Sequence, residues 1–99
     1  MHWEEWPIAL FPDGAGQCYS GTAVLARNRI PGVSADAKLP LPTLFFAGTA
    51  PFAQHLATST DGGRSWTRFA DNPVVKNMGD GDRDPKVVWH EPSQHYVMV

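Results

Sequence analysis

Several features that define whole classes of protein are scarce in this chain of 99 residues. Eight Lys and Arg stand against ten Asp and Glu, for a formal net charge of -2, so there is no basic field to hold a nucleic-acid backbone. Uninterrupted apolar runs such as residues 44–47 are far too short to span a bilayer. We therefore expect neither a nucleic-acid partner nor a membrane-spanning segment.

Cysteine and metal-binding patterns are equally sparse. The single cysteine, Cys18, has no partner within the chain for a disulfide. The four histidines have no zinc-ligand spacing, and we expect them at the surface or at strand edges. We expect no metal and no cofactor. The first residues have neither a basic nor an apolar signal region, so the sequence carries no readable secretory signal and leaves localisation open. The histidines are His2, His55, His90 and His95.

Glycine and proline, nine of each, interrupt the chain too often for a helix of useful length. Apolar and alternating stretches between these breaks instead predict an all-β chain. Four strands followed by two more predict one four-stranded antiparallel unit and the start of a second, as in β-propellers. A small β-sandwich or an open meander has similar spacing. The predicted strands are 18–26, 44–48, 55–60, 65–69, 86–90 and 96–99.

The segment 59–66, Ser-Thr-Asp-Gly-Gly-Arg-Ser-Trp, fits the Asp-box pattern Ser-x-Asp-x-Gly-x-x-Trp. In such a turn Asp61 bonds backbone amides, the glycines accept positive φ, and Trp66 packs beneath the chain. An Asp in a glycine-rich turn is usually a turn former. We therefore predict a structural hairpin here and no catalytic role for Asp61.

The acidic segment 80–84 is followed by Glu91 at the twelfth position, as in an EF-hand loop. The sixth position of that loop requires glycine, but Pro85 stands there, so we expect no calcium site of this kind. Arg83 and Asp84 precede Pro85 where a strand is predicted to enter the sheet. Their donor and acceptor groups suit neighbouring sugar hydroxyls, although the spacing alone favours a strand-leading turn with a local ion pair.

Together with these segments, several others resemble glycoside hydrolase family 32, the family of invertases, levanases and inulinases. The matching segments follow the family's order over nearly the whole chain, and 83–93 is the most specific of them. Residues 27–43 match least. The matching segments are 2–4, 7–13, 19–24, 59–67, 72–74 and 83–93.

The resemblance implies a five-bladed β-propeller and cleavage of β-fructofuranosyl bonds with retention of configuration. In the family's Arg-Asp-Pro motif the aspartate binds fructose hydroxyls and stabilises the transition state. Here that residue is Asp84, and Arg83 beside it is expected to bind the sugar. Tyr19 and Ser20 match the first two places of the family's Phe-Ser-Gly-Ser motif, which lines the fructose subsite. Tyr in place of Phe adds a hydroxyl to that wall.

Two catalytic residues of the family have no match in the chain. The nucleophilic aspartate belongs to an Asn-Asp-Pro motif upstream of the His2-Trp3 position, and the acid/base glutamate to a Glu-Cys motif downstream of Arg-Asp-Pro. The resemblance therefore implies that 1–99 is an incomplete segment of the family's N-terminal propeller catalytic domain, inactive alone. Its partner would be a fructose-containing oligo- or polysaccharide, such as sucrose, levan or inulin.

Two other interpretations remain open. Arg29-Ile30-Pro31 is similar to the Arg-Ile-Pro motif of sialidases, which also contain Asp boxes. A non-catalytic carbohydrate-binding propeller would share the strand pattern as well. Further Asp boxes in flanking sequence would favour the sialidase, whereas an upstream Asn-Asp-Pro motif would favour family 32.

Overall fold

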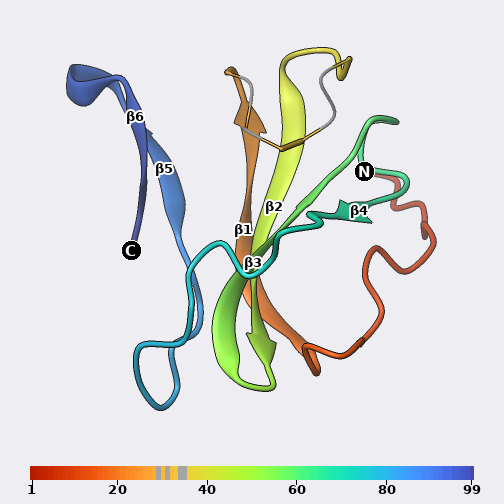
Figure 1. Ribbon diagram of the computed structural model, residues 1–99. Coiled ribbons are helices and arrows are strands. Elements are labelled where there is room, and N and C mark those ends of the chain that lie inside the picture. The colour runs from red at the N-terminus through yellow and green to blue at the C-terminus, as the bar shows by residue number, and fades with distance from the viewer. Residues whose placement is uncertain (29, 31, 34–35) are drawn as a thin grey trace.

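The computed structural model describes residues 1–28, 30, 32–33 and 36–99, and in this part it contains two antiparallel sheets and no α-helix (Figure 1). The first sheet has four strands in chain order, and the second is a two-stranded hairpin closed by a 3₁₀ turn, η1. Among the described residues, no helix has the length and apolar character to cross a membrane. The elements are β1 (Cys18–Ala26), β2 (Leu41–Thr49), β3 (Phe52–Thr58), β4 (Thr67–Arg68), β5 (Val87–His90), η1 (Glu91–Ser93) and β6 (His95–Met98).

The inner strands β2 and β3 carry most of the core. Phe46 and Leu56 are almost fully buried, and β3 is buried on both faces from Ala53 to Ala57. A strand covered on both faces shows an apolar run rather than strict alternation. This explains why the short apolar stretch at 44–48 predicts a buried strand correctly.

An irregularity interrupts β1 near its start. Cys18 pairs with Gly48 and Gly21 pairs with Phe46, so three steps along β1 match two along β2. The extra residue makes a β-bulge in the segment that holds Tyr19 and Ser20. Gly21 is required there, because a Cβ would lie 1.9 Å from the Phe45 carbonyl oxygen.

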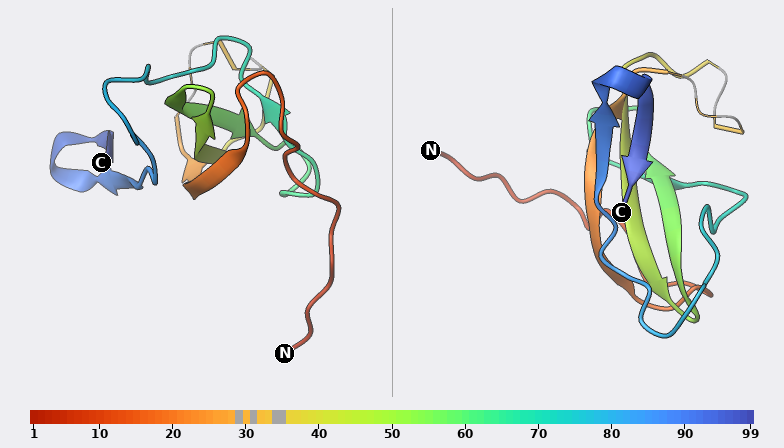
Figure 2. Two further views of the ribbon diagram at one scale, coloured as in Figure 1. Left: turned by 90° about the horizontal axis from the view of Figure 1, so that it is seen from below. Right: turned by 90° about the vertical axis from the view of Figure 1, so that its left-hand side faces the viewer.

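Three hydrogen bonds fix the hairpin β5–β6 beside β1. The Thr22 hydroxyl donates to the Pro85 carbonyl oxygen at 2.7 Å, just before β5 begins. At the other end the Tyr96 hydroxyl donates to the Leu25 carbonyl oxygen at 3.0 Å and accepts from the Arg27 N–H at 3.1 Å. β5 therefore runs beside β1 in the same direction, and the hairpin lies over one side of the larger sheet (Figure 2).

The first residues of the chain extend away from the two sheets (Figure 2). The Arg64 guanidinium lies over the Trp6 ring at 4.6 Å, and Arg68 of β4 fastens residues 11–13. Arg68 Nε lies 3.2 Å from the Asp13 carboxylate, and its Nη2 donates to the Phe11 carbonyl oxygen. The same guanidinium lies 5.2 Å from the centroid of the Phe46 ring. One arginine thus joins residues 11–13 to the core of the sheet by charge and by cation–π attraction.

The expected position of His55 is wrong. This residue is 6% exposed and stacks on Phe46 with ring centroids 5.5 Å apart, since it lies on the doubly covered strand β3. Burial lowers its pKa below the ordinary 6.5, and the charge of Arg68 lowers it further, while Asp13 opposes the change. Folding therefore shifts His55 towards its neutral form.

The predicted strands agree with the structure in number and order, and their bounds differ in places. The bounds of β1 are as predicted, whereas β2 and β3 each begin three residues earlier than expected. The strand predicted at 65–69 shrinks to Thr67–Arg68, because the Asp-box turn occupies the preceding residues. The 3₁₀ turn η1 separates the last two strands.

Candidate functional site

Tyr19 and Ser20 lie in the bulge of β1 and are exposed, Tyr19 to 50%. A β-bulge turns side chains out of the regular alternation of a strand, and bulges are frequent beside active sites. An exposed aromatic ring and an adjacent hydroxyl suit a polar ligand that has an apolar face. The bulge thus presents both residues to solvent at one end of the sheet.

Arg83 and Asp84 lie in the loop that leads into β5. Asp84 has φ 59°, in the left-handed region that is uncommon for residues other than glycine. Its carboxylate Oδ2 lies 3.9 Å from Arg83 Nε, and the two side chains are 53% (Arg83) and 62% (Asp84) exposed. Both groups are therefore open to solvent and free to bind hydroxyls, one as donor and the other as acceptor.

Asp82 and Gln54 set the course of this loop. The Asp82 carboxylate Oδ2 accepts hydrogen bonds from the N–H groups of Met78 and Gly79 at 2.6 and 2.9 Å. The buried Gln54 of β3 donates from Nε2 to the Asp82 carbonyl oxygen at 3.0 Å. The backbone just before Arg83 is thus tied to the centre of the larger sheet.

Phe52, the first residue of β3, connects the two pairs of predicted site residues. Its ring meets that of Tyr19 edge to face, with centroids 5.9 Å apart and planes at 65°. The Arg83 guanidinium carbon lies 6.0 Å from the centroid of the same ring. Tyr19 and Arg83, 64 positions apart in the sequence, therefore share one aromatic neighbour.

Sequence reasoning missed Phe52, since nothing in its local pattern marks it. The residue follows the Ala50-Pro51 turn, and only the pairing of β2 with β3 brings that turn to the end of the sheet where the β1 bulge lies. A cavity of about 320 Å³ adjoins Arg83 and is lined also by Gln54, Asp82 and Pro85. Of the four predicted site residues, only Arg83 lines this cavity.

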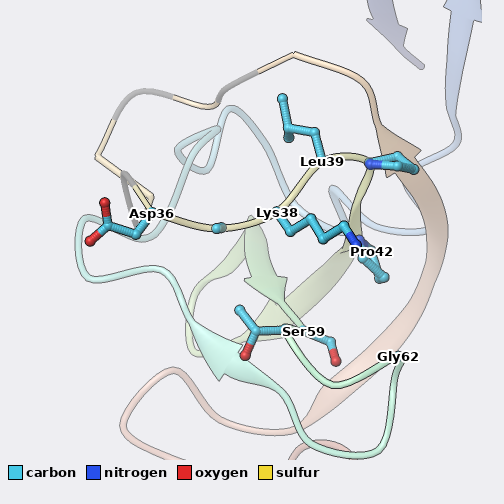
Figure 3. Close-up of a pocket in the computed structure, with 9 residues that line it drawn as sticks. Asp36, Lys38, Leu39, Pro42, Ser59 and Gly62 are labelled. Carbon is cyan, nitrogen blue, oxygen red and sulfur yellow. The ribbon is translucent and has the colours of Figure 1, made fainter.

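A second hollow, of about 500 Å³, lies at the opposite end of the larger sheet (Figure 3). There the segment that carries Asp36, Lys38 and Leu39 passes opposite the Asp-box turn at Ser59 and Gly62. The register places Ala26, Leu41 and the end of β3 at this end, and Cys18, Thr49 and Phe52 at the other. None of the predicted site residues lines this hollow.

The Asp-box turn has the predicted structural geometry. The Ser65 hydroxyl and the Ser65 N–H both donate to the Asp61 carboxylate, at 2.5 and 2.9 Å, and the Ser59 hydroxyl donates at 2.7 Å. These bonds, that of the Ser65 hydroxyl first, lower the pKa of Asp61 from 3.8 to about 2. Gly62 and Gly63 have positive φ, and Trp66 Nε1–H donates to the Gly63 carbonyl oxygen at 3.0 Å. Asp61 holds its own turn together.

Two further features considered from the sequence are a metal site and the sialidase-like motif. No group of three or more His, Cys, Asp or Glu among the described residues is placed to hold a metal ion. Of the sialidase-like Arg29-Ile30-Pro31, both Arg29 and Pro31 lie outside the residues that the structure describes. That motif therefore has no observed geometry.

Comparison with known proteins adds independent findings. The profile of the glycosyl hydrolases family 32 N-terminal domain matches residues 1–99. A levanase from Bacillus subtilis is 41% identical over 99 residues, which are 98% of this chain and 15% of that protein. An extracellular exo-inulinase from Aspergillus awamori is 35% identical over 125 residues, covering 99% of this chain and 23% of the inulinase. An invertase from Debaryomyces hansenii is 33% identical over 103 residues, covering 99% of this chain and 19% of the invertase.

A solved structure matches the whole arrangement of strands. The fructofuranosidase from Schwanniomyces occidentalis, in complex with fructose, superposes with a TM-score of 0.80 at 31% identity. The match covers 99% of this chain and 20% of the fructofuranosidase. The chain thus spans between about a seventh and a quarter of the length of these relatives. The four-stranded sheet and the hairpin are accordingly one propeller blade and the beginning of the next.

Proposed function

Since the chain belongs to glycoside hydrolase family 32, we propose that it forms part of an enzyme that hydrolyses β-fructofuranosyl bonds with retention of configuration. Residues 1–99 are, in this proposal, an incomplete segment of the N-terminal propeller catalytic domain. The substrates are fructose-containing saccharides such as levan, inulin or sucrose. The names of the levanase, the exo-inulinase and the invertase support that substrate class.

The observation that carries the proposal is the placement of the four predicted residues. Tyr19 and Ser20 in the β1 bulge lie at the same end of the fold as Arg83 and Asp84, with Phe52 between the two pairs. In the proposed site the Asp84 carboxylate accepts hydrogen bonds from fructose hydroxyls and Arg83 donates to them. Charge-assisted hydrogen bonds of this kind are the strong ones.

Asp84 acts on the transition state in this proposal. Retaining glycosidases form a positively charged, oxocarbenium-like transition state while one carboxylate attacks the anomeric carbon and a second carboxyl group protonates the leaving oxygen. The negative charge of Asp84, bound to the ring hydroxyls, stabilises this positive charge increasingly as it develops. We assign nucleophile and acid/base to no residue of 1–99, because none lies in the family's motifs for them.

A hybrid enzyme tests the proposal. Residues 1–99 replace the matching segment of the Bacillus subtilis levanase, so that the rest of that enzyme supplies the remaining site. We expect this hybrid to release fructose from levan, inulin or sucrose, and the 99-residue chain alone to release none above a blank. The unaltered levanase is the control.

Two outcomes contradict the proposal. A hybrid that folds as the levanase does, by circular dichroism and gel filtration, yet cleaves no fructoside shows that this segment does not fit the site. Fructose release by the isolated chain shows that the catalytic carboxylates lie within it.

A further inference from the structure

We propose that Phe52 is a positioning residue of the fructosyl site, whose ring fixes the guanidinium of Arg83 against the wall formed by Tyr19. The inference rests on the proposed function and adds to it a residue that lies outside every matched motif. Phe52 itself is not required to touch the sugar. It acts through the two residues that do.

The position of Phe52 suits this role because its backbone is held by the sheet. The residue begins β3 and pairs with Thr49 across the Ala50-Pro51 turn, and the next pair, Gly48 with Ala53, continues the ladder. Gly48 in turn pairs with Cys18, immediately before the bulge that carries Tyr19. The ring therefore projects from a rigid element, whereas Arg83 projects from a loop.

Arg83 has little else to hold it. Its ion pair with Asp84 spans 3.9 Å, and both side chains are more than half exposed. Exposed ion pairs of this length contribute little to order, since water screens them and a long side chain loses rotamer freedom. The Phe52 ring, 6.0 Å from the guanidinium carbon, adds a cation–π attraction from a residue whose backbone is held in the sheet.

Tyr19 completes the arrangement from the other side. Its edge-to-face contact with Phe52, at 5.9 Å and 65°, is the geometry that aromatic pairs prefer. A Phe52 ring held by Tyr19 has a fixed orientation for the Arg83 guanidinium. Because a catalytic group displaced by about 1 Å can cost a large factor in rate, a loosely held Arg83 is expected to reduce turnover as well as affinity.

Three variants of the hybrid levanase test the inference. They are Phe52→Leu, Phe52→Tyr and the matched control Phe69→Leu. Leu keeps the apolar bulk at position 52 but removes the ring, whereas Tyr keeps the ring. We expect Phe52→Leu to lower kcat/KM about tenfold, the combined size of a cation–π and an aromatic contact, and Phe52→Tyr to retain it within about twofold. Phe69, half-buried beside β4 and away from the site, tests the cost of losing any phenylalanine.

A double-mutant cycle separates positioning from general structure. If Phe52 acts through Arg83, the double variant loses less kcat/KM than the product of the fold-losses of Phe52→Leu and Arg83→Gln. Fully multiplicative losses, or equal losses from Phe52→Leu and Phe69→Leu that follow the melting temperature, overturn the inference.

An NMR measurement that does not depend on catalysis distinguishes failure of the positioning role from failure of the proposed function. An inactive hybrid contradicts the proposed function, but the ¹⁵N-labelled hybrid still reports the Arg83 Nε–Hε resonance. Phe52→Leu is expected to shift and broaden this resonance, while Phe52→Tyr leaves it close to its original position. An Arg83 resonance unmoved by Phe52→Leu overturns the positioning role whatever the hybrid catalyses.

Discussion

Asp84 combines an unusual backbone conformation with an exposed carboxylate. Its φ of 59° is one of two positive values at non-glycine residues in the described part of the chain, and the other, Gln94, closes the turn of the β5–β6 hairpin. Asp and Asn occupy the left-handed region more readily than other residues that have a Cβ. Substitution by Asn therefore removes the charge of Asp84 and keeps its backbone, which makes it the informative change.

Asp61 gives a prediction about acid stability. Hydrogen bonds from Ser65 and Ser59 lower its folded pKa to about 2, from an ordinary 3.8. Above about pH 4 the carboxylate is ionised whether folded or not, and its stabilisation of the fold is complete. As the pH falls from about 4 to 2, the unfolded chain takes up the proton first, so that this stabilisation is lost.

The melting temperature of the hybrid levanase should fall between about pH 4 and pH 2, and the Asp61→Asn variant of the hybrid should show a smaller fall over the same range. Asp80→Asn, in an exposed loop, is the matched control and should leave the decline unchanged. Parallel curves for the Asp61→Asn variant and the unaltered hybrid would show that the turn does not depend on the charge of Asp61.

At the scale of the elements, Tyr96 joins the beginning of the second blade to the first. Its hydroxyl is hydrogen-bonded to both Leu25 and Arg27, and its ring meets Trp89 edge to face at 4.9 Å. Tyr96→Phe keeps the ring contact and removes both hydrogen bonds. Each is worth about 0.5–1.5 kcal/mol net, so we expect a loss of about 1–2 kcal/mol in the stability of hairpin docking.

Hydrogen exchange measures this loss where it occurs. In the hybrid, Tyr96→Phe should speed amide exchange in β5 and β6 and leave β2 and β3 protected. The ring-removing variant Tyr96→Leu should have a larger effect in the same strands. Unchanged exchange in β5 and β6 would mean that Thr22 and the packing of the hairpin hold it without Tyr96.

The elements also show what sequence reasoning reaches and what it does not. The alternation at 18–26 predicts β1 with its bounds, and the Asp-box spacing predicts a turn whose bonds all lie within a few residues. The early start of β2 is not predicted, because Pro42 interrupts the apolar run, yet Pro42 lies in the ladder opposite Leu25. Local chemistry is readable, whereas a strand end depends on its partner.

The candidate site divides in the same way. Arg83, Asp84, Tyr19 and Ser20 were found from motifs, but their relation to one another depends on the bulge between Cys18 and Gly21 and on the docking of β5 beside β1. Both are products of pairing between distant segments. Phe52 was missed for this reason, and so was the burial of His55 on the doubly covered strand β3.

At the scale of the whole molecule, the chain exposes much apolar surface on its strands. Leu25 of β1 is 59% exposed, and Val88 and Val97 of the hairpin are 47% and 39% exposed. Exposed apolar residues along unpaired strand edges favour association. We expect the isolated 99-residue chain to aggregate or to unfold with poor cooperativity.

Sedimentation velocity and thermal circular dichroism of the purified chain test this expectation, with the hybrid levanase as comparison. The isolated chain should sediment as larger species or melt over a broad range, and the same residues within the hybrid should melt sharply. A soluble monomer with one sharp transition would show that a blade and the beginning of another suffice for a stable fold.

In our proposal, Asp84 belongs to a fructosyl site formed where β1 and β5 begin. The most direct test is kcat and KM of the hybrid levanase carrying Asp84→Asn, measured beside Asp80→Asn from the same loop. We predict that Asp84→Asn lowers kcat on the order of 100-fold with little change in KM, as for a group that acts mainly in the transition state, while Asp80→Asn keeps both constants. An Asp84→Asn hybrid with unchanged kcat would contradict it.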